Sequence, residues 1–275
     1  MPEKERRRLD VELVRRGLAE SRSKAQEMLA AGLVTADGRP AAKASLPVSD
    51  ETAIACSGAP RYVGRGGDKL EKAMAFAEVS PQDSICLDVG ASTGGFTDCM
   101  LQHGAKKIYA VDVGSGQLHE RLRRDPRVVC MEKTDIRDAA RVGEKISPGE
   151  IRLCSVDVSF ISLRQVLPAV WPYMAEDGRV VCLVKPQFEA GRGALGKSGV
   201  VRDRGIHLQV LRELWDFWHG QGCRVLALTH SPITGGDGNI EYLAVLSRCA
   251  QETVQVQMLR PIVESAFNEL KGNKR

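Results

Sequence analysis

The sequence predicts an α/β protein with two domains of unequal size. A small N-terminal α+β domain at residues 1–58 and a linker at 59–64 precede a larger α/β domain at 65–275. Beyond residue 84, short apolar runs alternate with helical patterns, as in a doubly wound parallel sheet. A glycine-rich segment, Asp88–Asp98, joins the first of these runs to its helix. The N-terminal residues show a separate pattern of two helices followed by short strands.

The N-terminal domain is expected to begin with two helices between Arg6 and Ala31. Gly17 is placed to end the first helix, and Ser21 to cap the second. A strand should follow over residues 32–39, running into an Asp-Gly turn, and another over Val48–Ala55. Basic residues are dense in this region, but acids partly offset them, so a solvated two-helix cap is the alternative to a binding surface.

The larger domain is expected to alternate strands and helices and to end in an antiparallel strand pair and a surface helix. The predicted strands are Ser84–Leu87, Lys107–Asp112, Val128–Met131, Ile151–Phe160, Arg179–Glu189, Cys223–Ser231 and Asn239–Leu246. The predicted helices are Asp68–Ala77, Phe96–His103, Gln117–Arg124, Leu163–Met174, Gly205–Gly220 and Pro261–Leu270.

The glycine-rich turn has the order of a nucleotide-type binding site. Glycines such as Gly90 accept a positive φ and let a ligand approach closely, and the following helix directs free N–H groups towards it. Asp112 stands about 20 residues further on, where a ribose-binding carboxylate is expected. Ser92 replaces the second glycine of the dinucleotide fingerprint, which favours S-adenosylmethionine over NAD. Asp135, after the third strand, is placed to receive the adenine amino group.

We assign these residues to the cofactor site together with the rest of the turn; a tight turn inside the core is the alternative. The full set is Asp88, Gly90, Ser92, Gly94, Gly95, Phe96, Thr97, Asp112 and Asp135.

Four charged residues are candidates for catalysis. Asp157 and Lys185 end parallel strands, at the edge where open α/β sheets bind ligands. Lys69 stands at the start of a helix, where the helix dipole does not favour a cation. Glu241 follows a glycine-rich segment and could reach the same edge. The alternative is a set of structural ion pairs and surface lysines.

The chain resembles two known families. Arg8-Leu-Asp10, Ser21-Arg22-x-x-Ala25 and Asp37-Gly38 are similar to the small RNA-binding domain named after ribosomal protein S-four. Lys69, Asp157, Lys185 and Glu241 occur in the order of the tetrad of FtsJ/RrmJ-like ribose 2′-O-methyltransferases. Across nearly its whole length, the chain resembles TlyA proteins, which join these two domains. The segments Arg65-Gly-Gly-x-Lys-Leu, Val-Lys-Pro-Gln-Phe-Glu and Gly-Asn-x-Glu-Tyr carry this resemblance together with the glycine-rich turn.

The resemblance implies 2′-O-methylation of cytidine in ribosomal RNA of the small or large subunit. Lys185 would then accept or orient the 2′-hydroxyl proton, Lys69 would add a second positive charge, and both acids would hold the amines. Arg6, Arg22, Lys24 and Arg65 are expected to bind RNA. Phe160 and Phe188 are candidates for stacking on the target base, with core packing as the alternative.

Composition restricts the remaining possibilities. The net charge of +4 is small, and the 8 cysteines form no C-x-x-C pair, so we expect neither disulfides nor a metal site. No apolar run is long enough for a membrane span, and the N-terminus lacks a signal peptide, so we expect a cytoplasmic protein. Two rival functions stay open: a haemolysin, since TlyA relatives also carry that label, and a non-catalytic ribosome-assembly factor. The sequence does not define the oligomeric state.

Overall fold

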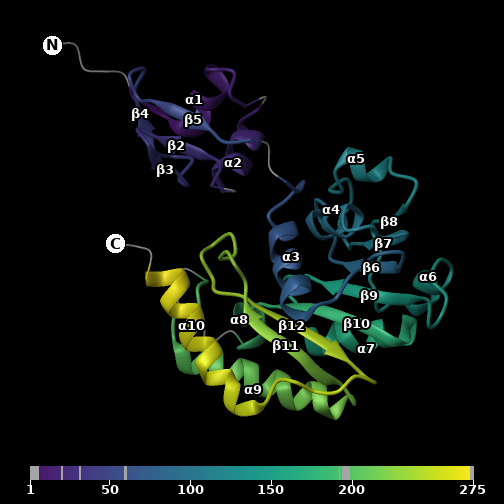
Figure 1. The fold of residues 1–275 in the computed structure, drawn as a ribbon. Helices are drawn as coiled ribbons and strands as arrows, with labels where there is room; N and C mark the ends of the chain where they lie inside the picture. Colours follow the sequence, from purple (N-terminus) through teal and green to yellow (C-terminus); the bar gives the residue numbers. More distant parts are fainter. Residues whose placement is uncertain are drawn as a thin grey trace. The chain divides into compact units, whose positions relative to one another are not determined.

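The computed structural model describes residues 6–19, 21–30, 32–58, 61–191, 193 and 199–272. The chain forms two compact units, Met1–Arg65 and Gly66–Arg275 (Figure 1). The expected linker at residues 59–64 lies at the end of the first unit, and two of its residues fall outside the described part. We describe each unit by itself.

The described residues of the N-terminal unit form two helices, one two-stranded ladder and one three-stranded sheet of order β3-β2-β5. The strand β1 pairs antiparallel with β4. The elements are β1 Arg7–Arg8, α1 Leu9–Arg15, α2 Arg22–Ala30, β2 Val34–Ala36, β3 Arg39–Pro40, β4 Pro47–Val48 and β5 Ile54–Cys56. Side chains from both helices and from β2 form a small core of their own, including Leu9, Leu13, Ala25, Leu29 and Val34.

Two predictions for this unit were wrong in detail. Arg7 and Arg8 form a strand and not the first turn of a helix, because the chain stays extended where it pairs with Pro47 and Val48. The expected strand Val48–Ala55 is interrupted by a turn, in which Ser49 N donates to Thr52 Oγ1 at 3.1 Å. The Asp-Gly turn is present, with both of its residues at positive φ.

The larger unit is organised by a seven-stranded sheet of order β11-β12-β10-β9-β6-β7-β8. β10, β9, β6, β7 and β8 are parallel, and β12 is antiparallel to both of its neighbours. This confirms the predicted Rossmann-like α/β fold with an antiparallel closing pair. The strands are β6 Ile85–Val89, β7 Lys107–Val111, β8 Val128–Met131, β9 Ile151–Val156, β10 Met174–Val184, β11 Arg224–His230 and β12 Tyr242–Ser247.

Helices flank the sheet (Figure 1). They are α3 Gly66–Ala77, α4 Gly95–Gln102, α5 Glu120–Arg123, α6 Ala139–Gly143, α7 Leu163–Val170, α8 Pro186–Glu189, α9 Arg204–Gly220 and α10 Leu259–Gly272, with 3₁₀ turns at Trp171–Tyr173 and Val256–Met258. α3 contacts α4, β11 and β12, whereas α9 contacts α10 and β11. The strands are apolar on both faces, and Cys86, Cys154 and Cys182 are buried in them as free thiols.

Several element boundaries differ from prediction where the chain leaves the sheet. The strand expected over Arg179–Glu189 begins earlier, at Met174, and stops at Val184. Pro186 then occupies the first position of the short helix α8, because proline lacks the N–H that a strand ladder needs but suits a helix start. The strand expected to reach Phe160 ends at Val156. α6 was not predicted, and most of the expected loop at residues 191–197 lies outside the described residues.

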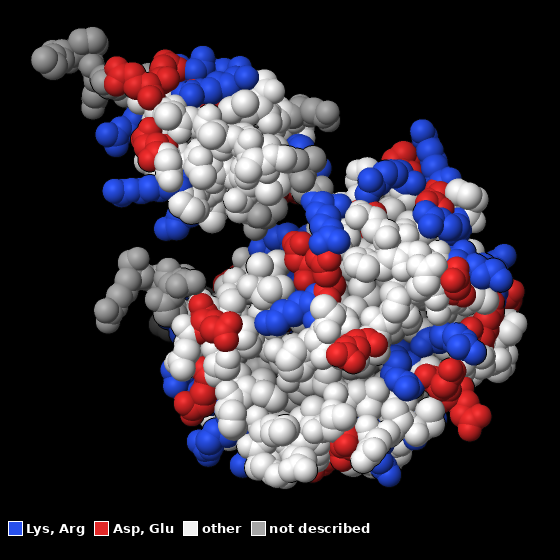
Figure 2. Space-filling view, in the orientation of Figure 1, with Lys and Arg blue, Asp and Glu red and all other residues white. Residues whose placement is uncertain are grey.

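Within the ranges the structure describes, none of the helices combines the length and apolarity required to cross a bilayer. Basic and acidic side chains alternate over the face shown in Figure 2. This mixing agrees with the small net charge of the chain.

Candidate active site

A cavity of about 690 Å³ opens at the carboxyl ends of the parallel strands. Its volume lies within the range typical of small-molecule sites. The strand ends meet at one edge of the sheet, which brings residues from distant parts of the chain together. The lining includes Val89, Gly90, Ser92, Val111, Asp112, Val113, Gln117, Thr134, Asp135, Ile136, Arg137, Asp157, Val158, Ser159 and Phe160.

The glycine turn after β6 forms one wall of this cavity. Gly90 has φ +83°, and a Cβ there would lie 2.3 Å from the Asp157 carbonyl oxygen. Gly94 has φ +97°, and a Cβ would lie 2.2 Å from Leu122 Cδ1. A side chain is therefore excluded at both positions by backbone conformation and by space. Ser92 also adopts a positive φ of 49°, and its N–H donates to the Asp112 carboxylate at 2.8 Å.

The residues predicted to bind a cofactor fall into two groups. Gly90, Ser92, Asp112 and Asp135 line the cavity. The others are buried in and behind the turn and are not part of the lining: Asp88, Gly94, Gly95, Phe96 and Thr97.

Asp88 is the centre of the buried group. Its carboxylate accepts hydrogen bonds from Thr97 Oγ1 at 2.6 Å and from Ser155 Oγ at 2.9 Å. Burial raises the pKa of Asp88 to about 6, against these two hydrogen bonds. The network ties the start of α4 to β6 and β9, so Asp88 acts on the cavity through the shape of the turn.

The two acids that line the cavity are both held in place. Asp112 accepts the N–H of Gly114 at 2.7 Å through its second oxygen. Asp135 is paired with the Arg137 guanidinium at 2.6 Å, and this hydrogen bonding lowers the pKa of Asp135. Hydrogen bonds thus fix the position of each carboxylate at the cavity wall.

The four predicted catalytic residues form two close ion pairs. Lys69 Nζ lies 2.6 Å from Glu241 Oε2, and the two side chains are 8% and 3% exposed. Lys185 Nζ lies 2.6 Å from Asp157 Oδ1 and donates to Ser159 Oγ at 3.0 Å. Neither amine points into bulk solvent, and each meets one of the predicted acids.

The sheet register brings the two pairs to the same place. Val184 at the end of β10 is paired with Tyr242 at the start of β12. Lys185 directly follows β10 and Glu241 directly precedes β12, so their backbones are neighbours just beyond the ends of the two strands. A Cβ at Gly235 would lie 2.6 Å from Glu241 Oε1, so the glycine-rich loop before β12 leaves room for the carboxylate.

Two phenylalanines lie beside this site. The Phe160 side chain is 91% exposed and its φ is +65°, which is strained for a bulky residue. Its ring centroid lies 4.9 Å from that of Phe188, and Lys185 Nζ lies 5.9 Å from the Phe188 centroid. The alternative that Phe160 is a core residue is wrong.

The basic residues predicted to bind RNA differ in their surroundings. Arg22 pairs with the buried Asp10 at 3.0 Å, and Lys24 pairs with Glu27 at 3.1 Å. Arg6 is exposed and Arg65 is half-buried at the end of the first unit.

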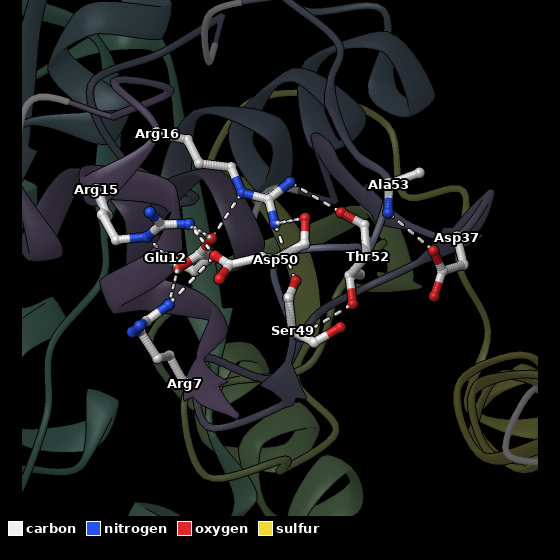
Figure 3. A network of polar contacts seen from close by, with 9 residues as sticks. All are labelled: Arg7, Glu12, Arg15, Arg16, Asp37, Ser49, Asp50, Thr52 and Ala53. Carbon is white, nitrogen blue, oxygen red and sulfur yellow. Dashed lines mark hydrogen bonds and ion pairs between the residues drawn. The ribbon is translucent and has the colours of Figure 1, made fainter. Parts of the chain in front are cut away.

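The N-terminal unit holds two carboxylates that the sequence analysis did not single out. Asp10 is fully buried and accepts a bidentate pair from Arg8. Figure 3 shows Arg7, Arg15 and Arg16 gathered around Glu12, which is also buried. Hydrogen bonds from Arg15 and Arg16 lower the pKa of Glu12 to about 2. These two acids hold the surrounding arginine side chains in place. Their positions in the helical pattern did not distinguish them from acids exposed to solvent.

Comparison with known proteins agrees with this geometry. The model of the FtsJ-like methyltransferase family matches residues 62–248, and that of the S4 domain matches residues 7–54. The chain belongs to the FtsJ-like methyltransferase family. It combines that domain with an N-terminal S4 domain, as the sequence predicted.

Relatives match over nearly the whole chain. The 16S/23S rRNA (cytidine-2′-O)-methyltransferase TlyA of Mycobacterium tuberculosis is 42% identical, covering 96% of this chain and 98% of its own. Hemolysin A of Brachyspira hyodysenteriae is 42% identical, covering 86% of this chain and 98% of its own. A solved structure from Streptococcus thermophilus is 43% identical with a TM-score of 0.76, covering 99% of both chains.

The described residues contain no group of three or more His, Cys, Asp or Glu side chains arranged to hold a metal ion.

The cavity lining adds Gln117 and Thr134, which the sequence analysis did not assign. Both follow strand ends at the same edge as Asp112, so their position after a predicted strand was the available signal.

Proposed function

We propose that this protein transfers a methyl group from S-adenosylmethionine to the ribose 2′-hydroxyl of cytidine in ribosomal RNA. The observation that carries the proposal is the pair of lysine–carboxylate contacts, Lys69–Glu241 and Lys185–Asp157, of which Asp157 lines the strand-end cavity. Two lysines and two acids that meet at neighbouring strand ends are suited to activating a weakly acidic hydroxyl.

The cavity residues fit an adenosine-containing methyl donor. Its volume suits a nucleoside-sized ligand. We assign Asp112 to the ribose hydroxyls and Asp135 to the adenine amino group, since both line the cavity, and the turn at Gly90 to close approach of the donor to the backbone. When bound, S-adenosylmethionine supplies an electrophilic methyl group on a sulfonium.

Lys185 is the residue we assign to the proton of the 2′-hydroxyl. The amine would accept or orient this proton when bound S-adenosylmethionine supplies the methyl group to the ribose oxygen. Asp157, at 2.6 Å, orients the amine and balances the charge that it gains. The Lys69–Glu241 pair adds a second fixed charge centre against which the ribose is positioned. Because the reaction needs an in-line approach, positioning contributes much of the rate.

The exposed Phe160 ring supports recognition of an unstacked base. Single-stranded RNA bases are often held by stacking on aromatic side chains. Phe160 borders the cavity, and its exposed ring packs on Phe188. We assign Phe160 to stacking on the target cytosine.

The S4 domain is the part we assign to RNA binding, through phosphate contacts from Arg6, Arg22, Lys24 and Arg65. Buried Asp10 holds the Arg22 guanidinium from one side and leaves other N–H groups for a phosphate. The TlyA relative is named for cytidine methylation in 16S and 23S rRNA, which supports a ribosomal substrate, either as RNA or as assembled subunits. Such a substrate places the working enzyme in the cytoplasm.

The test is transfer of labelled methyl groups from S-adenosylmethionine to 16S and 23S rRNA and to both subunits, with mapping of 2′-O-methyl marks. We expect modified cytidines with the wild-type protein and a loss of about a hundredfold to ten-thousandfold in rate for Lys185→Ala with the fold retained. Full methylation by folded Lys185→Ala would contradict the assignment of the base.

The same experiment separates two rival functions. A non-catalytic assembly factor would bind the subunits without transferring label. The haemolysin function has the name of the Brachyspira relative in its favour, and leakage of dye from liposomes by the purified protein, without methyl transfer, would support it.

A further inference from the structure

The loop that follows β7 forms part of the cavity wall and is hydrogen-bonded to the glycine turn through Asp112 and His119. Two of its residues, Val113 and Gln117, line the cavity together with Asp112, which precedes the loop. The loop contains two glycines, Gly114 and Gly116, so its chain alone is weakly ordered. Something must therefore hold it in the shape that forms the wall.

Glu132, at the end of the neighbouring strand β8, makes the contacts that hold the middle of the loop. Its carboxylate accepts the backbone N–H groups of Gly116 at 2.8 Å, Gln117 at 3.0 Å and Leu118 at 3.2 Å. The Arg123 guanidinium donates to it at 2.8 Å. The Gly116 N–H first, and then Arg123, lower the pKa of Glu132 to about 2. The carboxylate is therefore ionised near neutral pH.

The ends of the loop are tied separately. The two oxygens of Asp112 accept the N–H groups of Ser92 and Gly114 at 2.8 and 2.7 Å. The Lys133 N–H donates to the Gly114 carbonyl at 2.8 Å, and the His119 N–H donates to the Thr93 carbonyl at 3.1 Å. Loss of the Glu132 carboxylate would thus free the centre of the loop and leave its ends attached.

The loop conformation also decides where Gln117 points. A Cβ at Gly114 would lie 2.3 Å from Gln117 Nε2, so the amide folds back against the Gly114 backbone and borders the cavity. An amide in this position offers both a donor and an acceptor to a ligand. It is next to the carboxylate that we assign to the ribose.

We propose that Glu132 is a positioning residue. By holding the loop after β7, it keeps Gln117 where this side chain contacts the adenosine part of the methyl donor. This inference rests on the proposed function, because it takes the cavity as the donor site. Glu132 itself faces the loop backbone and does not line the cavity. Its effect is on the fraction of molecules whose loop is already in the binding conformation.

The magnitude follows from that fraction. The apparent Kd equals the intrinsic Kd divided by the competent fraction, so a loop ordered in about one tenth of the molecules raises Kd about tenfold. We expect Glu132→Ala to raise the Kd for S-adenosylhomocysteine by about tenfold or more. In methyl transfer, KM for the donor should rise similarly, and kcat at saturating donor should stay within about twofold.

The test combines calorimetric titration with S-adenosylhomocysteine and hydrogen exchange of the free protein. In Glu132→Ala the amides of Gly116, Gln117 and Leu118 should exchange faster. Gln117→Leu keeps its backbone bond to Glu132, so it should weaken binding about fivefold without faster exchange. The matched control is Glu120→Gln, an exposed acid paired with Arg124, which should change neither quantity.

The outcomes are distinguishable. If the wild-type protein binds no S-adenosylhomocysteine, the proposed function fails and this inference fails with it. If the wild type binds but Glu132→Ala binds equally tightly, or if exchange accelerates without a change in Kd, the inference alone is overturned. If Glu132→Ala does not fold, Glu132→Gln keeps the side-chain shape without its charge, and an unchanged Kd there refutes the proposal.

Discussion

Replacement of Glu241 by glutamine tests whether the Lys69–Glu241 pair is a buried unit with a catalytic role. The pair joins α3 to the start of β12 at 2.6 Å, and the side chains are 8% and 3% exposed. Glu241→Gln leaves the ammonium of Lys69 without its counter-charge in a site with little water. Breaking a buried pair by removing one partner costs about 3–5 kcal/mol. The amide oxygen can still accept a hydrogen bond, so we expect the lower end, about 3 kcal/mol.

A second substitution separates stability from catalysis. Lys69→Met in the Glu241→Gln background removes the unpaired charge and fills the space with an apolar chain. Stability should return to within about 1 kcal/mol of wild type, since well-packed apolar replacements of buried pairs are close to neutral. Methyl transfer should be lost in both the single and the double variant, because neither keeps the Lys69–Glu241 charge pair that we assign to positioning the ribose.

Urea denaturation followed by tryptophan fluorescence is the stability assay. All three tryptophans, Trp171, Trp215 and Trp218, lie in the larger unit, so the signal reports that unit alone. A loss of about 3 kcal/mol lowers the midpoint by about 1 M urea. The matched control is Glu264→Gln in the exposed pair with Arg204, which should change stability by less than about 1 kcal/mol. An unshifted midpoint for Glu241→Gln, or full activity in the double variant, would refute the reasoning.

Three further predictions follow from the same structure. The folded-state pKa of Asp88 is about 6 against an ordinary 3.8, so the contribution of this group to stability is greatest below pH 3.8 and falls as pH rises to about 6. Asp88→Asn should remove this pH dependence, which amounts to about 3 kcal/mol in the free energy of unfolding. Denaturation at pH 4 and pH 7 measures it. Phe160→Ala should lower kcat/KM for RNA about tenfold to hundredfold without loss of stability, since stacking contributes about 1–3 kcal/mol per base, and Phe76→Ala, also exposed, should lower neither. Arg22→Ala with Lys24→Ala should lower the slope of log affinity for RNA against log salt by about 1.5 if each contacts one phosphate; an unchanged slope means that the S4 domain reads RNA elsewhere.

The residues of the cavity edge were predictable because they follow strand ends. Periodicity located β6, β7, β9 and β10, and the carboxyl ends of parallel strands share one edge. Asp112, Asp157 and Lys185 could therefore be placed near one another from sequence order alone. The likeness to the methyltransferase and S4 families added the two-domain organisation, which the family models confirm.

The pairing of charges was decided only by the tertiary structure. Lys69 and Glu241 are 172 residues apart in the chain, and their contact depends on the packing of α3 against β12. The register that places Glu241 beside Lys185 belongs to an antiparallel pair between β10 and β12, and α8, α9 and β11 lie between these strands in the chain. Neither relation leaves a local pattern, because each depends on how distant segments pack.

The sequence by itself determined the alternation of elements, the glycine turn and the residue types at the strand ends, because these depend on local backbone preference and hydrophobic period. Only the tertiary structure decided that Asp88 is a buried carboxylate hydrogen-bonded to α4 and β9, that Phe160 is exposed at positive φ, and that Glu132 holds the loop after β7. Those roles arise from burial and from hydrogen bonds to backbone groups on other elements. A linear pattern of side chains does not record either of them.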